Sequence, residues 1–142
     1  MNYIICGPAG SGKSTYVRNN MRPGDLVVDL DAIYAAISYL ANHRKPSQLA
    51  DSALSVYKYL VDSIDPDASN NTFPNAWVIA SGARISERKF LKDRLNAKVI
   101  LFEVGAQECL RRIESDDERK GYGIPWGKIV TGWWDVYEPG EV

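Results

Sequence analysis

The stretch "YIICGPAGSGKST", residues 3–15, joins a short apolar run to a glycine-rich loop and to the start of a helical pattern. Continuous Ile-rich runs of this length are typical of strands that are buried on both faces. Gly7, Gly10 and Gly12 allow the backbone that follows to curve closely around a ligand and to turn its N–H groups inward. The stretch therefore predicts a strand, a loop and a helix in succession, with an anion held in the loop.

The loop matches the complete Walker A pattern of a glycine, four residues, and then Gly12, Lys13 and Ser14. Lys13 supplies a positive charge to the β and γ phosphates, and Ser14 offers a hydroxyl to Mg²⁺ at the positive end of the helix. We expect ATP as the ligand, with GTP as an alternative, and Mg²⁺ as the metal. The predicted nucleotide-binding residues are Gly7, Pro8, Ala9, Gly10, Ser11, Gly12, Lys13, Ser14 and Thr15.

Further apolar runs alternate with helical patterns along the rest of the chain. The apolar runs cover residues 3–6, 25–29, 76–81 and 98–104. One helical pattern starts at Lys13, and five others cover residues 31–41, 47–64, 86–95, 106–114 and 126–137. This order favours an α/β layer with a parallel sheet, in which ligands bind beyond the carboxyl ends of the strands. We expect residues 1–142 to form one domain.

Composition limits the classes of protein to consider. The 142 residues are 45% hydrophobic, which suits one compact domain with a real core. Lys and Arg number 17 against 18 Asp and Glu, so the charge of -1 provides no global field for a polyanion. We expect both cysteines to be reduced packing residues. No leader or run of membrane length is apparent, so we expect a cytoplasmic protein with no membrane partner.

Two carboxylates follow the second apolar run. Asp29 and Asp31 are two residues apart, so on an extended chain they would face the same side, near the γ-phosphate position. Asp31 can accept the proton of an attacking hydroxyl, while Asp29 helps to order Mg²⁺. The alternative for Asp31 is an N-cap of the next helix. A motor or switch usually has an acid at the end of another strand, whereas the third run here ends in Ser81 and Glu103 falls inside the fourth.

At this point the chain resembles the P-loop kinases of the polynucleotide kinase and adenylylsulfate kinase type. The resemblance covers most of the chain, through "GPAGSGKSTYVR", "VVDLDAIYAAI", "WVIASGARISERK", "VILFEVGAQECLRRIESDDERKG" and "IPWGKIVTGWWDVYE". It implies a three-layer P-loop fold, in which a short parallel sheet is flanked by helices and a helical lid lies at about residues 111–125. It also implies that Asp31 is the base toward a 5′-hydroxyl group.

The resemblance is incomplete on the acceptor side. Polynucleotide kinases have an Arg where this chain has Tyr34, and they commonly have an Asp where it has Ser81, which Arg84 and "ERK" follow. By position, the resemblance still implies an acceptor site formed by Asp29, Tyr34, Ser81 and Arg84, although two of these residues differ in type from those of the family.

In the lid, family members place two arginines that offset the charge of the transferred phosphoryl group. Arg112 and Arg119 match them, and their separation of seven residues gives two turns of helix if the helix continues. Arg111 would then lie on the other face. The alternative is a solvated, charged helix face.

Two other groups of residues are interpreted as structural. The basic patch at His43, Arg44 and Lys45 reads as a solvated turn, or as a phosphate contact if the acceptor is an oligonucleotide. The stripe on the last helix reads as core, with a stacking platform for a base as the alternative. Its members are Ile129, Val130, Trp133, Trp134 and Tyr137.

Together these features predict an ATP-dependent phosphotransferase with Lys13, Asp31, Arg112 and Arg119 as catalytic groups. The favoured acceptor is a polynucleotide 5′-hydroxyl, so single-stranded nucleic acid ends are possible partners. A nucleoside, a nucleotide or another small metabolite is the alternative acceptor. A different class of protein, an ATP-binding regulatory or interaction module with weak ATPase activity, stays open.

Overall fold

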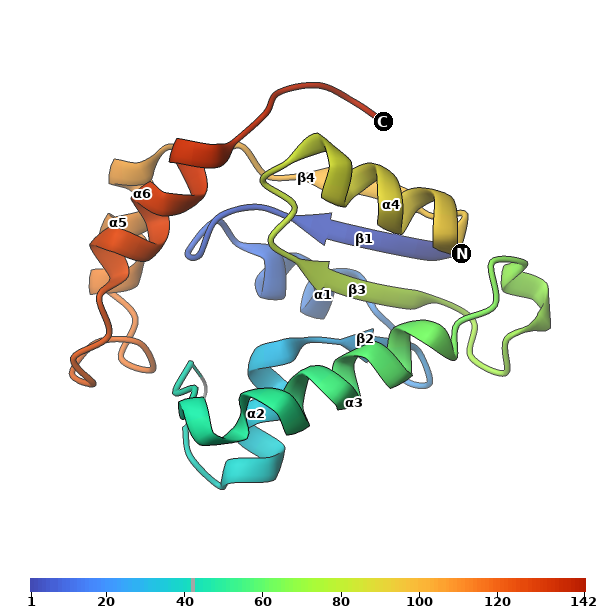
Figure 1. Ribbon diagram of the computed structural model, residues 1–142, viewed down its shortest axis with the longest axis horizontal. Helices are drawn as coiled ribbons and strands as arrows, with labels where there is room; N and C mark the ends of the chain where they lie inside the picture. Colours follow the sequence, from blue (N-terminus) through green and yellow to red (C-terminus); the bar gives the residue numbers. More distant parts are fainter. Residues whose placement is uncertain (42) are drawn as a thin grey trace.

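The computed structural model describes residues 1–41 and 43–142 and contains one parallel sheet in the order β2-β3-β1-β4 (Figure 1). The strands are β1 (Asn2–Cys6), β2 (Leu26–Val28), β3 (Ala76–Ala80) and β4 (Lys98–Leu101). Every strand pairing is parallel, with Ile4 opposite Val78 and Val99 on its two sides. The strand that leads into the phosphate loop is therefore a central strand, buried as the apolar run 3–6 predicts.

The helices confirm the predicted α/β order. Within the described ranges they are α1 (Lys13–Asn20), α2 (Leu30–Ser38), α3 (Ala50–Asp62), α4 (Ile85–Leu95), α5 (Ala106–Glu114) and α6 (Trp126–Val136). Short 3₁₀ turns occupy Ser47–Leu49 and Ala68–Asn70. None of the helices described is both long and apolar enough to cross a membrane.

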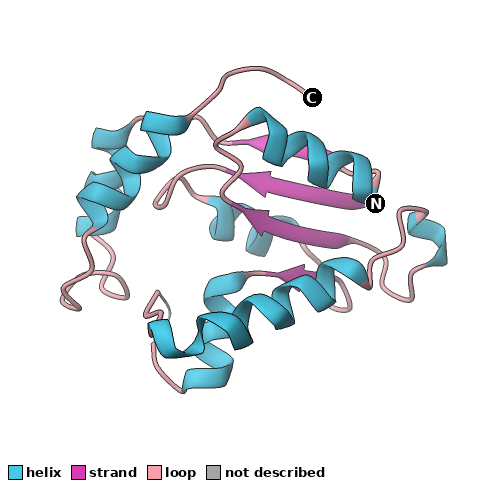
Figure 2. Cartoon of the chain, in the orientation of Figure 1, coloured by secondary structure: helices cyan, strands magenta, loops and turns pink. Residues whose placement is uncertain are grey.

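Alternation along the strands builds two core layers, one on each face of the sheet, and Figures 1 and 2 show the helices that cover these two faces. On one face of the sheet, Ile4 and Val78 pack with Val61 of α3 and Leu95 of α4. On the other face, the next residues along the strands pack on α1, where Tyr3 stacks on Trp77 with ring centroids 4.3 Å apart. The three layers follow from the period of two in a strand.

A third unit lies beyond the carboxyl ends of the strands. Helices α5 and α6 pack together through Cys109, Ile113 and Val130 and lie to the left of the sheet in Figure 1. Because all four strands are parallel, their carboxyl ends meet at this edge, and the paired helices overhang it.

Arg88 connects the loop after β3 to the segment after α6 through hydrogen bonds. Its side chain is buried, and its guanidinium group donates hydrogen bonds to the carbonyl oxygens of Gly82, Ala83, Glu138 and Gly140 at 2.5 to 3.1 Å. These carbonyls belong to the loop after β3 and to the segment after α6. The arginine of the "ERK" stretch therefore holds the loop that borders the site.

The loop after β3 passes directly over the end of β1. Gly82 has φ +59°, and a Cβ built there would lie 2.3 Å from Sγ and 2.6 Å from Cβ of Cys6. Cys6 and Cys109 are both free and buried, as the sequence predicts. Only glycine allows the loop to approach β1 this closely.

We therefore expect Gly82→Ala to destabilise the protein more than Gly24→Ala. Both glycines have positive φ, so both alanines lose about 1 to 2 kcal/mol by backbone strain. Gly24 has no atom within 4 Å of its built Cβ, whereas Gly82 adds a steric clash that costs about 1 to 3 kcal/mol more. Urea unfolding of both variants measures the difference, and equal losses would mean that Cys6 does not restrict the loop.

Candidate active site

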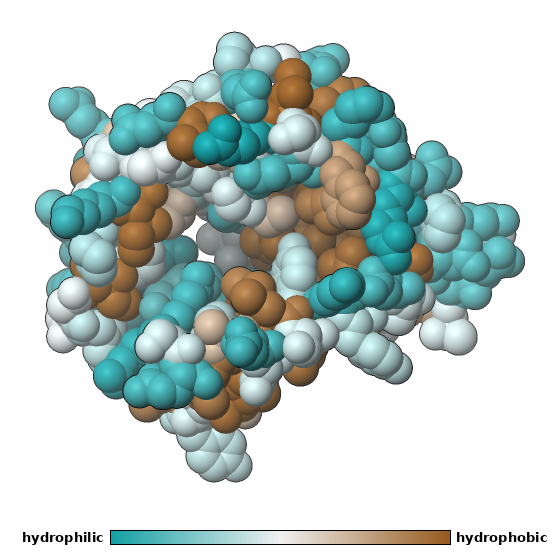
Figure 3. All heavy atoms as spheres, viewed as in Figure 1, coloured by the Kyte–Doolittle hydropathy of each residue, from teal (hydrophilic) through white to brown (hydrophobic). Residues whose placement is uncertain are grey.

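A cavity of about 810 Å³ opens at the carboxyl edge of the sheet, between the phosphate loop and the overhanging α5 and α6. The space-filling view in Figure 3 shows the molecule hollowed here. The walls come from the phosphate loop, the ends of β2 and β3, the segment after α2, and the lid. Its charged lining residues are Lys13, Asp29, Asp31, His43, Lys45, Glu87, Arg112, Asp116 and Arg119.

The phosphate loop packs beneath α5. Gly10 has φ +79°, and a Cβ built there would lie 2.8 Å from the carbonyl oxygen of Cys109 and 2.9 Å from Ile113. Gly12, with φ +99°, is the N-cap of α1. The loop that the sequence predicts around an anion is therefore also packed against α5.

Two polar side chains in the loop fit an anion. Lys13 is half-buried, burial lowers its pKa, and its Nζ donates to the carbonyl oxygen of Gly7 at 2.6 Å. Among the described residues, no carboxylate forms an ion pair with it. Ser11 is buried, and its Oγ has no hydrogen-bond partner in the described chain. An ammonium group and a hydroxyl with unused hydrogen-bonding capacity suit the oxygens of a polyphosphate.

Asp29 and Asp31 both line the cavity, but in different ways. Asp29 is the N-cap of α2, and its Oδ1 accepts a hydrogen bond from the backbone N–H of Asp31 at 3.1 Å. The alternative that made Asp31 the cap is therefore wrong, because the helix begins one residue earlier than the pattern suggests. Burial and the neighbouring Asp31 raise the pKa of Asp29.

Asp31 is held by two basic residues from the segment after α2. His43 Nδ1 lies 3.2 Å from Oδ2, and Lys45 Nζ lies 2.7 Å from Oδ1. Burial alone would raise the pKa of Asp31, but the His43 hydrogen bond and the Lys45 charge outweigh it and hold this pKa well below the usual range. With only 11% of its side chain exposed, His43 is not the solvated residue that the sequence suggests.

Arg112 and Arg119 both line the cavity, but they do so from two different segments and not from one continuous helix. Helix α5 ends at Glu114, so Arg112 and Arg119 do not share a helix, yet both line the cavity. Arg112 donates to the carbonyl oxygen of Ser11 at 3.2 Å, directly over the phosphate loop. Arg119 pairs with Asp116 at 3.5 Å and lies over the Trp126 ring, 5.7 Å from its centroid.

Two expected acceptor residues lie away from the cavity. Tyr34 is buried with Ile33 and Ala53 between α2 and α3, and Arg84 is the exposed N-cap of α4. Neither is among the lining residues. An aromatic side chain fills the contact between two helices where a polar one would need a partner, which explains the position of Tyr34.

Ser81 does line the cavity, and its backbone has a structural role. Its carbonyl oxygen accepts hydrogen bonds from the N–H of Gly7 at 3.2 Å and from Nε1 of Trp133 at 2.8 Å. Glu103, expected inside the fourth strand, instead lies two residues beyond β4, where it is exposed and accepts a hydrogen bond from Tyr137 at 2.5 Å. It does not face the phosphate loop.

The two carboxylates should have opposite effects on acid stability. The lowered pKa of Asp31 stabilises the folded protein above its ordinary value of 3.8, and that contribution is lost as the pH falls. The raised pKa of Asp29 stabilises it most at low pH, and that contribution is lost as the pH rises. Between about pH 6 and about pH 3, the Tm should therefore fall less in Asp31→Asn than in the wild type, and more in Asp29→Asn.

Asparagine still caps a helix, so Asp29→Asn isolates the charge from the cap. Thermal unfolding followed by circular dichroism provides the measurement. Parallel curves for the wild type and Asp31→Asn would show that His43 and Lys45 do not stabilise the Asp31 carboxylate in solution.

Comparison with known families gives one match. A sequence profile described as an AAA domain matches residues 3–122 of this chain. A search of curated protein sequences found no match.

Several solved structures share the fold at low sequence identity. A chain from the Pnkp1/Rnl/Hen1 RNA repair complex has a TM-score of 0.67 at 18% identity, over 95% of this chain and 44% of that one. Shikimate kinase from Acinetobacter baumannii, in complex with shikimate, has a TM-score of 0.58 at 17% identity, over 99% of this chain and 84% of that one. TT1252 from Thermus thermophilus has a TM-score of 0.55 at 18% identity, over 98% of this chain and 81% of that one. The present chain thus spans less than half the length of the first of these.

Proposed function

The chain belongs to the AAA domain family and has the kinase-type fold of the P-loop nucleoside triphosphatases, and from this premise we propose that it transfers the γ-phosphoryl group of ATP to a hydroxyl acceptor. The observation that carries the proposal is that one cavity contains both the phosphate-loop lysine, Lys13, and the carboxylate Asp31. In a hydrolytic switch the carboxylate of the site holds Mg²⁺, whereas this cavity contains a second one, Asp31, in addition to Asp29.

The donor half of the site is formed by the phosphate loop. Its backbone N–H groups and Lys13 would hold the β and γ phosphates, while Ser14 and Asp29 would hold Mg²⁺. Bound MgATP supplies the transferable phosphoryl group and a metal that bridges its oxygens. GTP is the alternative donor.

Asp31 acts on the acceptor. Because its pKa is held low by His43 and Lys45, it stays ionised and accepts a hydrogen bond from the incoming hydroxyl. The transition state of phosphoryl transfer is loose, so the hydroxyl proton leaves late and a weak base is sufficient. Orientation of the hydroxyl is then the main contribution of this carboxylate.

Arg112 and Arg119 offset the charge that spreads over the transferred oxygens. Arg112 already contacts the phosphate loop through Ser11. Arg119 approaches from the turn after α5, and its Nε atom is buried without a hydrogen-bond partner among the described residues. Both are therefore available to an anion in the cavity.

The favoured acceptor is a 5′-hydroxyl at a nucleic acid end. Its support is the resemblance of the sequence around Asp31 to polynucleotide kinases, together with Lys45, which lines the cavity from the segment between α2 and α3 and could contact a phosphate of the acceptor strand. A nucleoside or another small metabolite with a hydroxyl group is the second candidate, since the overall charge of -1 gives no long-range attraction for nucleic acid.

Incubation with γ-labelled ATP and a panel of acceptors tests the proposal. The panel contains 5′-hydroxyl DNA and RNA, nucleosides and nucleotides, and we expect label on the 5′-hydroxyl ends. Asp31→Asn should abolish the transfer and leave ATP binding largely intact, because Asp31 pairs with His43 and Lys45 and not with the phosphate-loop lysine. Lys13→Ala should abolish both, with Lys89→Ala on the remote α4 as the control.

Transfer of label to water alone would contradict the kinase and favour a regulatory module with weak ATPase activity. Retained transfer in Asp31→Asn would mean that this carboxylate is not the acceptor group. Protection of the Lys13→Ala variant against thermal unfolding by MgATP would contradict the phosphate-loop assignment.

Adjacent arginines in α5 give a matched test of the lid. Arg111 and Arg112 share the partner Glu108, but 67% of the Arg111 side chain is exposed and it does not line the cavity. We expect Arg112→Ala to lower kcat by roughly 10²-fold, because a preorganised charge donor is lost from the transition state. Arg111→Ala should leave kcat within about twofold. If both substitutions changed kcat equally in steady-state assays, Arg112 would have no role in catalysis beyond that of an exposed helix residue.

A further inference from the structure

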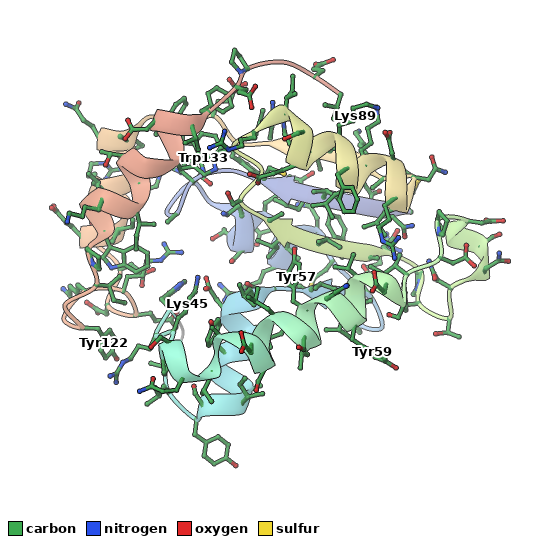
Figure 4. The ribbon with its side chains drawn as sticks, in the orientation of Figure 1. Lys45, Tyr57, Tyr59, Lys89, Tyr122 and Trp133 are labelled. Atoms are coloured by element: carbon green, nitrogen blue, oxygen red, sulfur yellow. The ribbon has the colours of Figure 1, made fainter. Side chains whose placement is uncertain are left out.

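The cavity has a charged half and an apolar half. The apolar half is formed chiefly by one face of α6, where Ile129, Gly132, Trp133 and Val136 recur at three- and four-residue spacing and all line the cavity. We call these four residues the α6 wall. In Figure 4, Trp133 and Lys45 lie on opposite sides of the hollow.

The outer residues of the α6 wall are not packed as core. Ile129 is 43% exposed and Val136 is 37% exposed, whereas Val130, on the face toward α5, is fully buried. The stripe on this helix therefore divides into a core face and a face that borders the cavity. Apolar side chains that remain accessible inside a cavity are available to a ligand.

The tryptophans at this face have no free polar group. Trp133 Nε1 donates to the carbonyl oxygen of Ser81 at 2.8 Å, and Trp126 Nε1 donates to that of Arg119 at 3.1 Å. Trp133 is also only 7% exposed and stacks on Tyr137 with ring centroids 4.8 Å apart, so the accessible surface of the α6 wall is mainly the aliphatic surface of Ile129 and Val136. Such a surface binds a flat, apolar group by contact and cannot read its hydrogen-bonding edge.

Gly132 leaves room for such a group. It lies in the interior of α6, where glycine is less favourable than alanine, and a Cβ built there would have no atom of residues 1–41 or 43–142 within 4 Å. Packing thus gives no reason for a glycine at this position. The consequence of the missing side chain is open space on the wall, between Ile129 and Val136.

The wall lies on the acceptor side of the site. Trp133 is tied to Ser81 at the end of β3, and β3 pairs with β2, which leads directly into Asp29 and Asp31. The α6 wall therefore adjoins the end of β3 and faces Asp31, which is paired with Lys45, from the opposite side of the cavity (Figure 4).

We propose that the α6 wall holds the planar ring of the phosphoryl acceptor, a nucleobase-like group, by face contact over Gly132 and without selection among bases. The proposal rests on the proposed function, because the ring belongs to the acceptor whose hydroxyl contacts Asp31. It adds the class of acceptor: a hydroxyl carried by a group with a flat ring.

The second helical glycine of α6 provides a matched control. Gly127 also has no atom within 4 Å of its built Cβ, but it does not line the cavity. Gly132→Leu should raise the KM for 5′-hydroxyl dinucleotides by about tenfold, because the leucine occupies the space of the ring, and leave the KM for ATP within about twofold. Gly127→Leu should change neither.

Alanine variants at the same two positions test whether a side chain at each position is compatible with folding. Gly132→Ala should raise the Tm by about 3 °C, because it removes a helix-interior glycine without a clash, whereas Gly127→Ala, at the second residue of α6, should change the Tm less. Dinucleotides with each of the four bases at the 5′ end should react with similar KM values. An abasic 5′ end should bind weakly and should be insensitive to Gly132→Leu.

Direct binding separates this proposal from the proposed function. If the wild type labels no acceptor, the kinase proposal fails, but quenching of tryptophan fluorescence by adenosine still reports on the wall and should be lost in Gly132→Leu. Three results would contradict the proposal that the α6 wall binds the acceptor ring. In Gly132→Leu, the KM for the acceptor and the binding of adenosine could both stay unchanged, or the KM for ATP could rise in place of the KM for the acceptor. The third result is that the wild type uses an abasic 5′ end as well as a complete one.

Discussion

The half-buried ammonium group of Lys13 is the constraint on which the rest of the site depends. Its hydrogen bond to the Gly7 carbonyl satisfies one of three donors, and no described carboxylate forms an ion pair with it. The glycine loop can hold this charge only in its tightly curved form, which also makes the surface beneath α5 at Gly10. Anion binding and lid position therefore depend on the same few residues of backbone.

The two aspartates illustrate how neighbouring groups of one kind acquire different properties. Asp29 is tied to the backbone as a helix cap, and burial beside another carboxylate raises its pKa. Asp31 faces His43 and Lys45, which keep it ionised. In the proposed reaction, a carboxylate that is already charged and held by two residues has little freedom to reorganise, so it suits the orientation of a hydroxyl more than strong base catalysis. That division of roles arises from one turn of chain after β2.

Local patterns in the sequence predicted most of the fold, because each signal lies within a few residues. The Ile-rich run before Gly7 and the alternation of strands and helices are of this kind, and the structure confirms them. Contacts between distant segments were not predictable in the same way. His43 reaches Asp31 through the loop after α2, and Tyr34 turns inward because α3 covers it. Arg112 and Arg119 both line the cavity although the helix ends between them, which the seven-residue spacing alone does not reveal.

Three glycines of this chain fall into two groups: two that folding requires and one that folding does not explain. At Gly10 and Gly82, a built Cβ would collide with backbone or with a buried cysteine, so folding itself requires glycine. At Gly132 no atom of the described part of the chain lies within 4 Å of a built Cβ, and the helix would be more stable with alanine. A residue that weakens its own helix and relieves no clash needs another explanation, and its position on the cavity wall provides one. Under the proposal made for the α6 wall, the cost to folding follows from keeping space in the cavity that Asp31 also lines.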